Sequence, residues 1–167
     1  MIPAKKAFII SPIGEEGSNE RKHADNVLNY IIKPALKKCG VEPIRSDRIS
    51  KPGLITNEMM DAIIKYDMSI AVLAFNNRNV YYELAIAQAA NKPVIILKHR
   101  DEGLPFDIKD WKYVEYDLED TKKLFEGFYV DIIVEFTKSI EDSDWKSPSS
   151  IPGFSSTLTS KEESSIF

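Results

Sequence analysis

Cysteine and histidine are scarce in this chain of 167 residues, which has one cysteine, Cys39, and two histidines, His23 and His99. A single cysteine cannot form an intramolecular disulfide, and these three side chains fall short of the four ligands of a structural zinc site. We therefore expect no metal, no cofactor and a reducing, cytoplasmic setting. Both histidines are expected to be surface groups.

Long hydrophobic runs and a strong excess of one charge are also missing. Near the N-terminus, Lys5 and Lys6 are followed by an apolar run of only residues 7–10 before Ser11 and Pro12, which is too short for a signal peptide or a membrane span. The 22 basic and 26 acidic residues are well mixed and give a net charge of -4, which argues against a surface that coats nucleic acid. We expect a soluble protein with neither a membrane nor a nucleic acid as its partner.

Several motifs of known enzymes are absent. The sequence has no Walker A loop, no G-x-G-x-x-G fingerprint and no G-x-S-x-G elbow, which argues against the commonest nucleotide-binding and serine-hydrolase sites. A response regulator is excluded because the first predicted strand ends at Ser11 rather than in an acidic cluster, and the third ends in Ala74 and Phe75 rather than an aspartate.

Strand and helix patterns alternate along the rest of the chain. Helices are predicted over 24–39, with a kink at Pro34, from 50–53 onwards with a core face of Leu54, Ile55, Met59, Ile63 and Ile64, around Glu83, and over 121–140. Strands are predicted over 7–10, 41–44, 68–75, 93–97 and 111–116. This alternation predicts an α/β fold, a doubly wound five-stranded parallel sheet in the flavodoxin-like order 2-1-3-4-5. Residues 1–141 form the predicted domain, and 142–167, rich in Ser, Thr and Pro, a mobile extension.

Glu83 is the most informative residue because it occupies the apolar face of its predicted helix, among Val80, Ile86 and Ala87. One interpretation is structural: Glu83 lies in the first turn, where the helix dipole favours a negative charge, and pairs with a nearby Lys or Arg. The other is functional: Glu83 is a nucleophile or acid at the floor of a pocket, where desolvation tunes its chemistry.

Three loops meet at the carboxyl edge of the predicted sheet, where ligands bind in this architecture. The first holds Ser11, Pro12, Ile13 and Gly14 and leads to Arg21, and it could cradle a phosphate or a ribose. The second begins at Asp47, and the third runs from Phe75 to Asn79. Phe75, Tyr81, Tyr82 and Trp111 could stack on a base. Glycine and serine also serve ordinary turns, and aromatic residues more often belong to the core or its rim.

A succession of motifs from about Lys6 to Asp117 resembles the bacterial TIR-like proteins related to nucleoside 2-deoxyribosyltransferases. They are FIISPIG, SNER with HADNVLNYIIKPAL, RSDRISKPGLIT, NRNVYYELAIAQAANKPVIIL and LPFD. The resemblance implies that Glu83 is catalytic, that Ser11 to Gly14 with Arg21 lie on the phosphate or ribose side, and that Asn79 precedes the catalytic helix. The acid usual in this family before the N-x-N motif is replaced by Val72, for which Asp47 or Asp67 could substitute.

Three functions follow from the resemblance. The first is cleavage of the N-glycosidic bond of NAD or a related nucleotide by a homo-oligomer, as in an antiviral effector. The second is nucleoside 2-deoxyribosyl transfer or nucleotide N-hydrolysis in salvage. The third, favoured by Val72, is a non-catalytic nucleotide sensor or assembly module.

Overall fold

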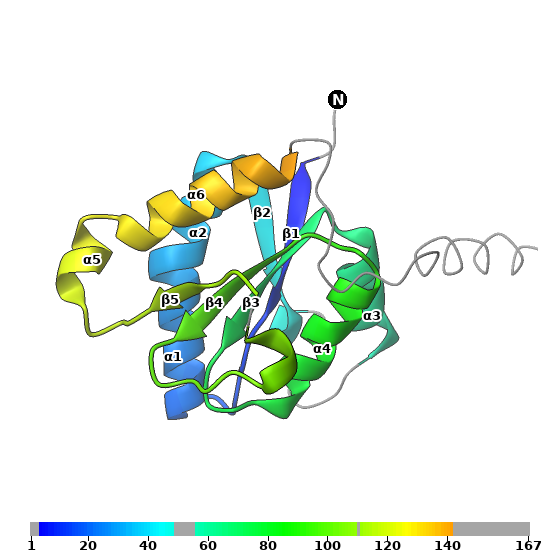
Figure 1. The fold of residues 1–167 in the computed structure, drawn as a ribbon, viewed down its shortest axis with the longest axis horizontal. Helices are drawn as coiled ribbons and strands as arrows, with labels where there is room; N and C mark the ends of the chain where they lie inside the picture. The colour runs from blue at the N-terminus through cyan, green and yellow to red at the C-terminus, as the bar shows by residue number, and fades with distance from the viewer. Residues whose placement is uncertain (1–3, 49–55, 110, 142–167) are drawn as a thin grey trace, which may run out of the picture.

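The computed structural model describes residues 4–48, 56–109 and 111–141, which form a five-stranded sheet with helices on both faces (Figure 1). The strands are β1 (Lys5–Ile10), β2 (Val41–Arg45), β3 (Met68–Leu73), β4 (Val94–His99) and β5 (Val114–Tyr116). The helices are α1 (Asn19–Val27), α2 (Lys33–Lys38), α3 (Asn57–Lys65), α4 (Arg78–Ala89), α5 (Thr121–Phe125) and α6 (Phe128–Glu141). Three short helices are η1 (Leu28–Ile32), η2 (Ser46–Arg48) and η3 (Phe106–Ile108).

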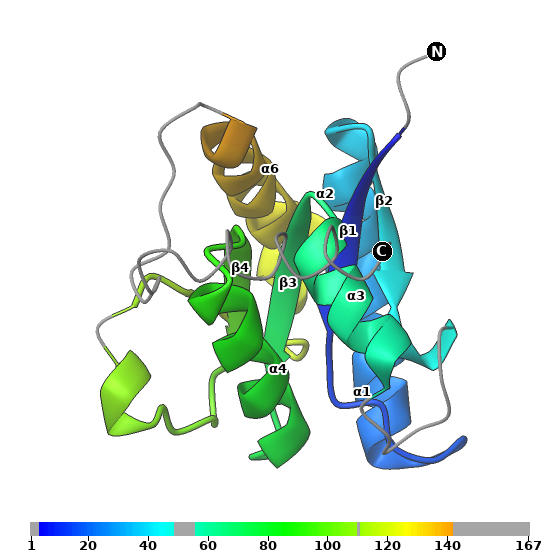
Figure 2. The same ribbon diagram turned by 90° about the vertical axis from the view of Figure 1, so that its right-hand side faces the viewer.

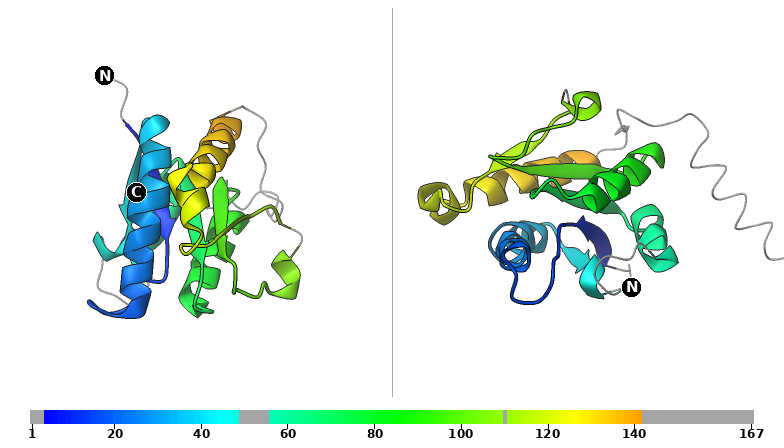
Figure 3. Two further views of the ribbon diagram at one scale, coloured as in Figure 1. Left: turned by 90° about the vertical axis from the view of Figure 1, so that its left-hand side faces the viewer. Right: turned by 90° about the horizontal axis from the view of Figure 1, so that it is seen from below.

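All neighbouring strands pair in parallel, in the order β2-β1-β3-β4-β5, so the predicted fold class and strand order are confirmed. One apolar cluster fills the space between the sheet and α1, η1, α2 and α6, and a second lies between the sheet and the α3–α4 pair. Figures 2 and 3 show these two helical layers on opposite sides of the strands. The strand order reverses between β1 and β3, which is where ligands bind in such sheets.

The predicted helix of residues 24–39 begins earlier than expected and has an irregular middle. It starts at Asn19, because the side chain of Ser18 caps the first turn by accepting a hydrogen bond from the Arg21 amide. Over Leu28–Ile32 the chain adopts π-helical bonding before it returns to an α-helix. Pro34, the second residue of α2, lies just after this segment, and its missing N–H accounts for the irregularity that the sequence predicts there.

Other boundaries also differ from the sequence predictions. The fifth strand covers only Val114–Tyr116 of the predicted 111–116, and the third ends at Leu73 instead of Phe75. The predicted closing helix is two helices, because Gly127 has a φ of 72° and interrupts α-helical geometry between α5 and α6. The predicted helix start at 50–53 and the predicted extension 142–167 lie outside the described residues.

Candidate active site

Glu83 lies on α4, which covers the β1–β3 region of the sheet together with α3. Asn77 caps this helix, since its side-chain oxygen accepts hydrogen bonds from the amides of Asn79 and Val80. The helix begins at Arg78, so Glu83 is in the second turn, beyond the short reach of the helix dipole. This position does not agree with the structural interpretation, which places Glu83 in the first turn.

The carboxyl group of Glu83 is buried, and the described residues provide no hydrogen bond or ion pair to it. The residue is 5% exposed, and its Oε2 atom has no hydrogen bond. Among the described residues no Lys or Arg forms an ion pair with it, contrary to the structural interpretation. Burial raises the pKa of Glu83 from 4.5 to about 7. Glu83 is therefore a desolvated acid that changes its charge near neutral pH.

The turn that leads into α4 has an unusual backbone held by a buried acid. Phe75 and Asn76 have φ values of 58° and 47°, in the left-handed region that is strained for residues other than glycine. Glu102, which is 8% exposed, accepts a 3.1 Å hydrogen bond from the Asn76 amide and a 2.8 Å hydrogen bond from the Tyr81 hydroxyl. Glu102 thus ties the loop after β4 to the turn and to the first part of α4.

Phe75 belongs to a cluster of four rings at the same edge of the sheet. His23 packs edge to face against Phe75 at 5.0 Å and against His99 at 5.2 Å between ring centroids, and its Nε2 lies 2.7 Å from the Tyr116 hydroxyl. Burial, and then the charge of His99, lower the pKa of His23 to about 4, so this imidazole is neutral at pH 7. The prediction that both histidines are simple surface groups is wrong, because β4, β5 and α1 bring them together.

Four charged side chains form a network at the end of β2. Arg45, the last residue of β2, bonds Asp47 through Nε at 2.8 Å and Asp25 through Nη2 at 2.6 Å. Arg21 bonds Asp47 at 3.1 Å and Asp25 at 3.3 Å. Burial alone would raise the pKa of Asp47, but the hydrogen bond and charge of Arg45, with the charge of Arg21, hold it below its ordinary value. Asp47 is therefore ionised and paired with both arginines.

Arg45 and Glu102 were not singled out by the sequence. Arg45 is 5% exposed and its Nη1 atom is buried with no hydrogen bond, so it is a further candidate for contact with an anionic or hydroxylated ligand. The signal that could have found it is the R-x-D spacing at the end of a predicted strand. The role of Glu102 could not be predicted from the sequence, because its two partners lie 21 and 26 residues away along the chain.

The predicted phosphate loop after β1 is closely packed. Ser11, Pro12 and Ile13 are buried, and the Ser11 hydroxyl donates to the Pro12 carbonyl. Gly14 has a φ of 64°, and a Cβ atom there would lie 2.6 Å from the Ser18 hydroxyl oxygen. The loop therefore needs glycine at this position, and the close approach of its backbone to α1 explains why.

The remaining predicted residues lie on α4 and the turn before it. Asn79 and Tyr82 are exposed, as is Phe75 at 48%, whereas Glu83 faces the core. Because all five strands are parallel, the segments that contain Ser11, Asp47 and Phe75 follow strands that end at one edge of the sheet. That placement is as expected, and the role of each residue in binding stays a prediction.

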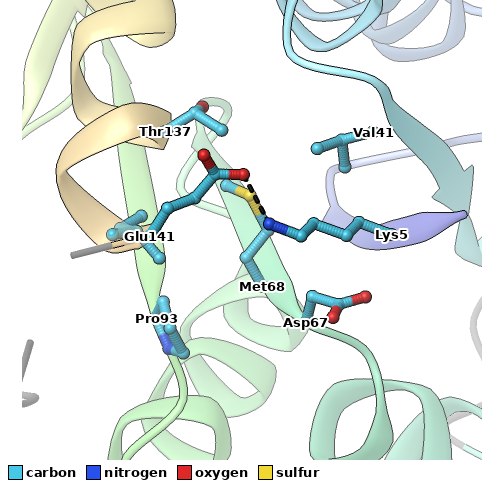
Figure 4. A pocket seen from close by; sticks show the side chains of 8 residues that line it. Lys5, Val41, Asp67, Met68, Pro93, Thr137 and Glu141 are labelled. Carbon is cyan, nitrogen blue, oxygen red and sulfur yellow. Dashed lines mark hydrogen bonds and ion pairs between the residues drawn. The ribbon is translucent and has the colours of Figure 1, made fainter. Parts of the chain in front are cut away.

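A hollow of about 180 Å³ at the opposite, amino edge is separate from this site (Figure 4). Lys5 forms a 2.6 Å ion pair with Glu141 across it, and Asp67 lies beside them. Asp67 also accepts a 2.7 Å hydrogen bond from the Lys6 amide, before β3 begins. Asp67 is therefore at the wrong end of β3 to replace the acid that is missing at Val72.

The described residues contain no group of three or more His, Cys, Asp or Glu side chains placed to hold a metal ion. None of the helices in 4–48, 56–109 and 111–141 is both long and apolar enough to cross a membrane.

No protein-family model and no curated protein matches this sequence. Among solved structures, the chain is similar to the TIR domain of the Toll-related receptor TRR-2 from Hydra magnipapillata, with a TM-score of 0.52 and 19% sequence identity. The similarity covers 78% of this chain and 98% of that one. A second similar structure is the CMP N-glycosidase BcmB of Clostridium botulinum, with a TM-score of 0.48 and 20% identity over 73% of this chain and 97% of that one. The first likeness shows a TIR-like fold, and the fold implied by the sequence resemblance is thereby confirmed.

Proposed function

We propose that this protein cleaves the N-glycosidic bond of a nucleotide, with Glu83 as the group that acts on the sugar. The observation that carries the proposal is the buried carboxyl of Glu83, which has no hydrogen bond at Oε2 and a pKa raised to about 7. Burying an unpaired acid destabilises a fold, and such groups concentrate at functional sites.

The chemistry of the bond suits a single carboxylate. When the bond between the anomeric carbon and the base breaks, its electron pair leaves with the base and positive charge develops on the sugar. The Glu83 carboxylate either stabilises this charge or forms a bond to the anomeric carbon, which water or a second base then displaces. A base that is already cationic, such as the nicotinamide of NAD, leaves as a neutral molecule and needs no strong acid.

NAD is the substrate we favour, because the sequence resemblance includes TIR domains that cleave it. Phe75, exposed at the carboxyl edge, offers a ring for stacking, and the free Nη1 of Arg45 offers a donor to ribose or phosphate. Transfer of a deoxyribosyl group, or hydrolysis of another nucleotide, would use the same carboxylate with a different acceptor or base.

A non-catalytic nucleotide sensor is the second candidate, and a specific observation favours it. Val72 is buried in the apolar cluster on the α1 side of the sheet, so this position holds no second acid. Asp47 is neutralised by two arginines and Asp67 lies at the opposite edge, so neither replaces it.

Product analysis distinguishes these functions. Concentrated protein, which allows for assembly into a homo-oligomer, is incubated with NAD, nucleoside monophosphates and deoxynucleosides, and the products are identified by mass spectrometry. Nicotinamide with ADP-ribose supports the NAD reaction, and a free or exchanged base supports the salvage reactions. Nucleotide binding without turnover would favour the sensor, and turnover that survives Glu83→Gln would refute the role of Glu83.

A further inference from the structure

Phe75 combines an exposed ring with a strained backbone. The residue is 48% exposed, and its φ of 58° lies in the left-handed region. A glycine or an asparagine at this position would adopt that backbone more easily and would expose less apolar surface to water. Strained residues of this kind cluster at active sites and ligand clamps. Phe75 also follows the carboxyl end of β3, at the edge where ligands bind in parallel sheets.

The Phe75 ring packs against a side chain that is itself anchored in the core. The ring of His23 lies edge to face with it, with 5.0 Å between the centroids and 85° between the planes. The Nε2 atom of His23 is 2.7 Å from the hydroxyl oxygen of Tyr116, a fully buried residue of the apolar cluster on the α1 side of the sheet. His99 packs against the rings of both His23 and Tyr116. His23 therefore connects the exposed ring of Phe75 to the core.

The backbone beside Phe75 is held by a separate contact. Glu102 accepts a 3.1 Å hydrogen bond from the amide of Asn76, the next residue, and a 2.8 Å hydrogen bond from the Tyr81 hydroxyl. Both the ring of Phe75 and the turn that carries it are thus fixed by other parts of the chain. A ring that is already fixed loses little conformational freedom when a ligand stacks on it.

We propose that Phe75 is a stacking platform for the base of the bound nucleotide and that His23 is the positioning residue which fixes its ring. An aromatic platform suits any base, because every base has a π-face. Burial, and then the charge of His99, lower the pKa of His23 to about 4, so at pH 7 this imidazole is neutral and does not repel a cationic base. The choice of a nucleotide as ligand rests on the proposed function, whereas the contacts between the rings do not.

The test compares NAD, which carries bases, with ribose 5-phosphate, which has none. Binding of both is measured by calorimetry on the full chain with Glu83→Gln, which prevents turnover. Phe75→Ala should weaken NAD binding by about fivefold or more, as expected for the loss of one stacked base. His23→Leu removes the ring behind Phe75 and should weaken it by about three- to tenfold. Tyr30→Ala, which removes an exposed ring of η1, should change nothing, and ribose 5-phosphate should bind equally to all variants.

A double variant separates positioning from damage to the fold. His23→Phe combined with Tyr116→Phe keeps both rings and leaves no buried hydroxyl without its partner, so NAD should bind with unchanged affinity. This variant also serves as the control for the fold if ribose 5-phosphate does not bind. With Glu83 restored and NAD cleaved, His23→Leu should raise KM and leave kcat unchanged, because the ring acts on binding alone.

Unchanged NAD affinity in Phe75→Ala would overturn the platform, and this variant decides alone if His23→Leu does not fold. Equal losses for NAD and ribose 5-phosphate, or no saturable binding of NAD, would also overturn it. Cleavage of NAD with a KM that His23→Leu leaves unchanged would contradict the positioning role and not the proposed function. NAD binding that needs both rings without any turnover by the original protein would contradict the proposed function and not the platform.

Discussion

The substitution Glu83→Gln gives the most direct prediction, because it removes the charge and keeps the shape. In the folded protein Glu83 has a pKa of about 7, against an ordinary value of 4.5. At 1.36 kcal/mol for each pKa unit, this difference corresponds to about 3 kcal/mol, an upper value for a group with limited access to solvent. Ionisation of Glu83 therefore lowers the free energy of unfolding by up to this amount.

The sign of this effect depends on pH. Below pH 4.5 Glu83 is protonated in both the folded and the unfolded chain, and it has no effect on the pH dependence of stability. Between 4.5 and about 7 the unfolded chain loses its proton first, so stability falls as pH rises. Above about 7 both forms are ionised and the whole loss is present. Glu83→Gln should therefore change stability little at pH 4.5 and raise it by up to about 3 kcal/mol at pH 8.

Urea unfolding at both pH values measures this, with Glu135→Gln on the exposed side of α6 as the matched control. The control should change stability by less than about 0.5 kcal/mol. For a chain of this size the gain at pH 8 corresponds to a rise in Tm of roughly 6–12 °C. Base release by the original protein should increase as pH passes through about 7, and Glu83→Gln should abolish it. A variant that is destabilised equally at both pH values and still active would refute the reasoning.

Three further substitutions test other segments at the carboxyl edge of the sheet. Glu102→Gln should destabilise the protein by about 1–3 kcal/mol in urea unfolding and accelerate hydrogen exchange at the Asn76 amide, and unchanged exchange there would show that Glu102 does not hold the turn. Arg21→Ala should weaken nucleotide binding by about 1–3 kcal/mol in calorimetry, and unchanged binding would remove this residue from the site. Gly14→Ala should destabilise by more than Gly17→Ala, because both have positive φ but only at Gly14 does a Cβ meet another side chain, at 2.6 Å. The reverse order, measured by thermal unfolding, would contradict the packing of this loop.

The sheet could be predicted from the sequence because its signal is local. Buried parallel strands are short apolar runs, and the run Phe8-Ile9-Ile10 and the strand of Ile95 and Ile96 need no long-range information to be recognised. The ends of elements were harder. Phe75 continues the apolar run of β3 in sequence, and only the hydrogen bond from the next residue to Glu102 reveals that the strand has already turned.

Part of the site could be predicted for a similar reason. Glu83 interrupts an apolar helical stripe, so its burial is visible from spacing alone, whereas its place in the second turn depends on the cap at Asn77. The burial of Arg45 and of the two histidines was harder to predict, because charged and polar residues are usually exposed. Their burial comes from partners such as Asp25 and Tyr116, which lie 20 and 93 residues away along the chain.

These observations give α4 a consistent physical interpretation. Its start is fixed by the Asn77 cap and by a strained turn that Glu102 holds in place. Strain at Asn76 and an unpaired acid at Glu83 both destabilise the fold, and they occur within eight residues of each other. These two features lie in the turn before α4 and in its second turn, and ordinary side chains at both places would avoid the cost. Their proximity is consistent with the proposal that this part of the chain is kept for binding and chemistry.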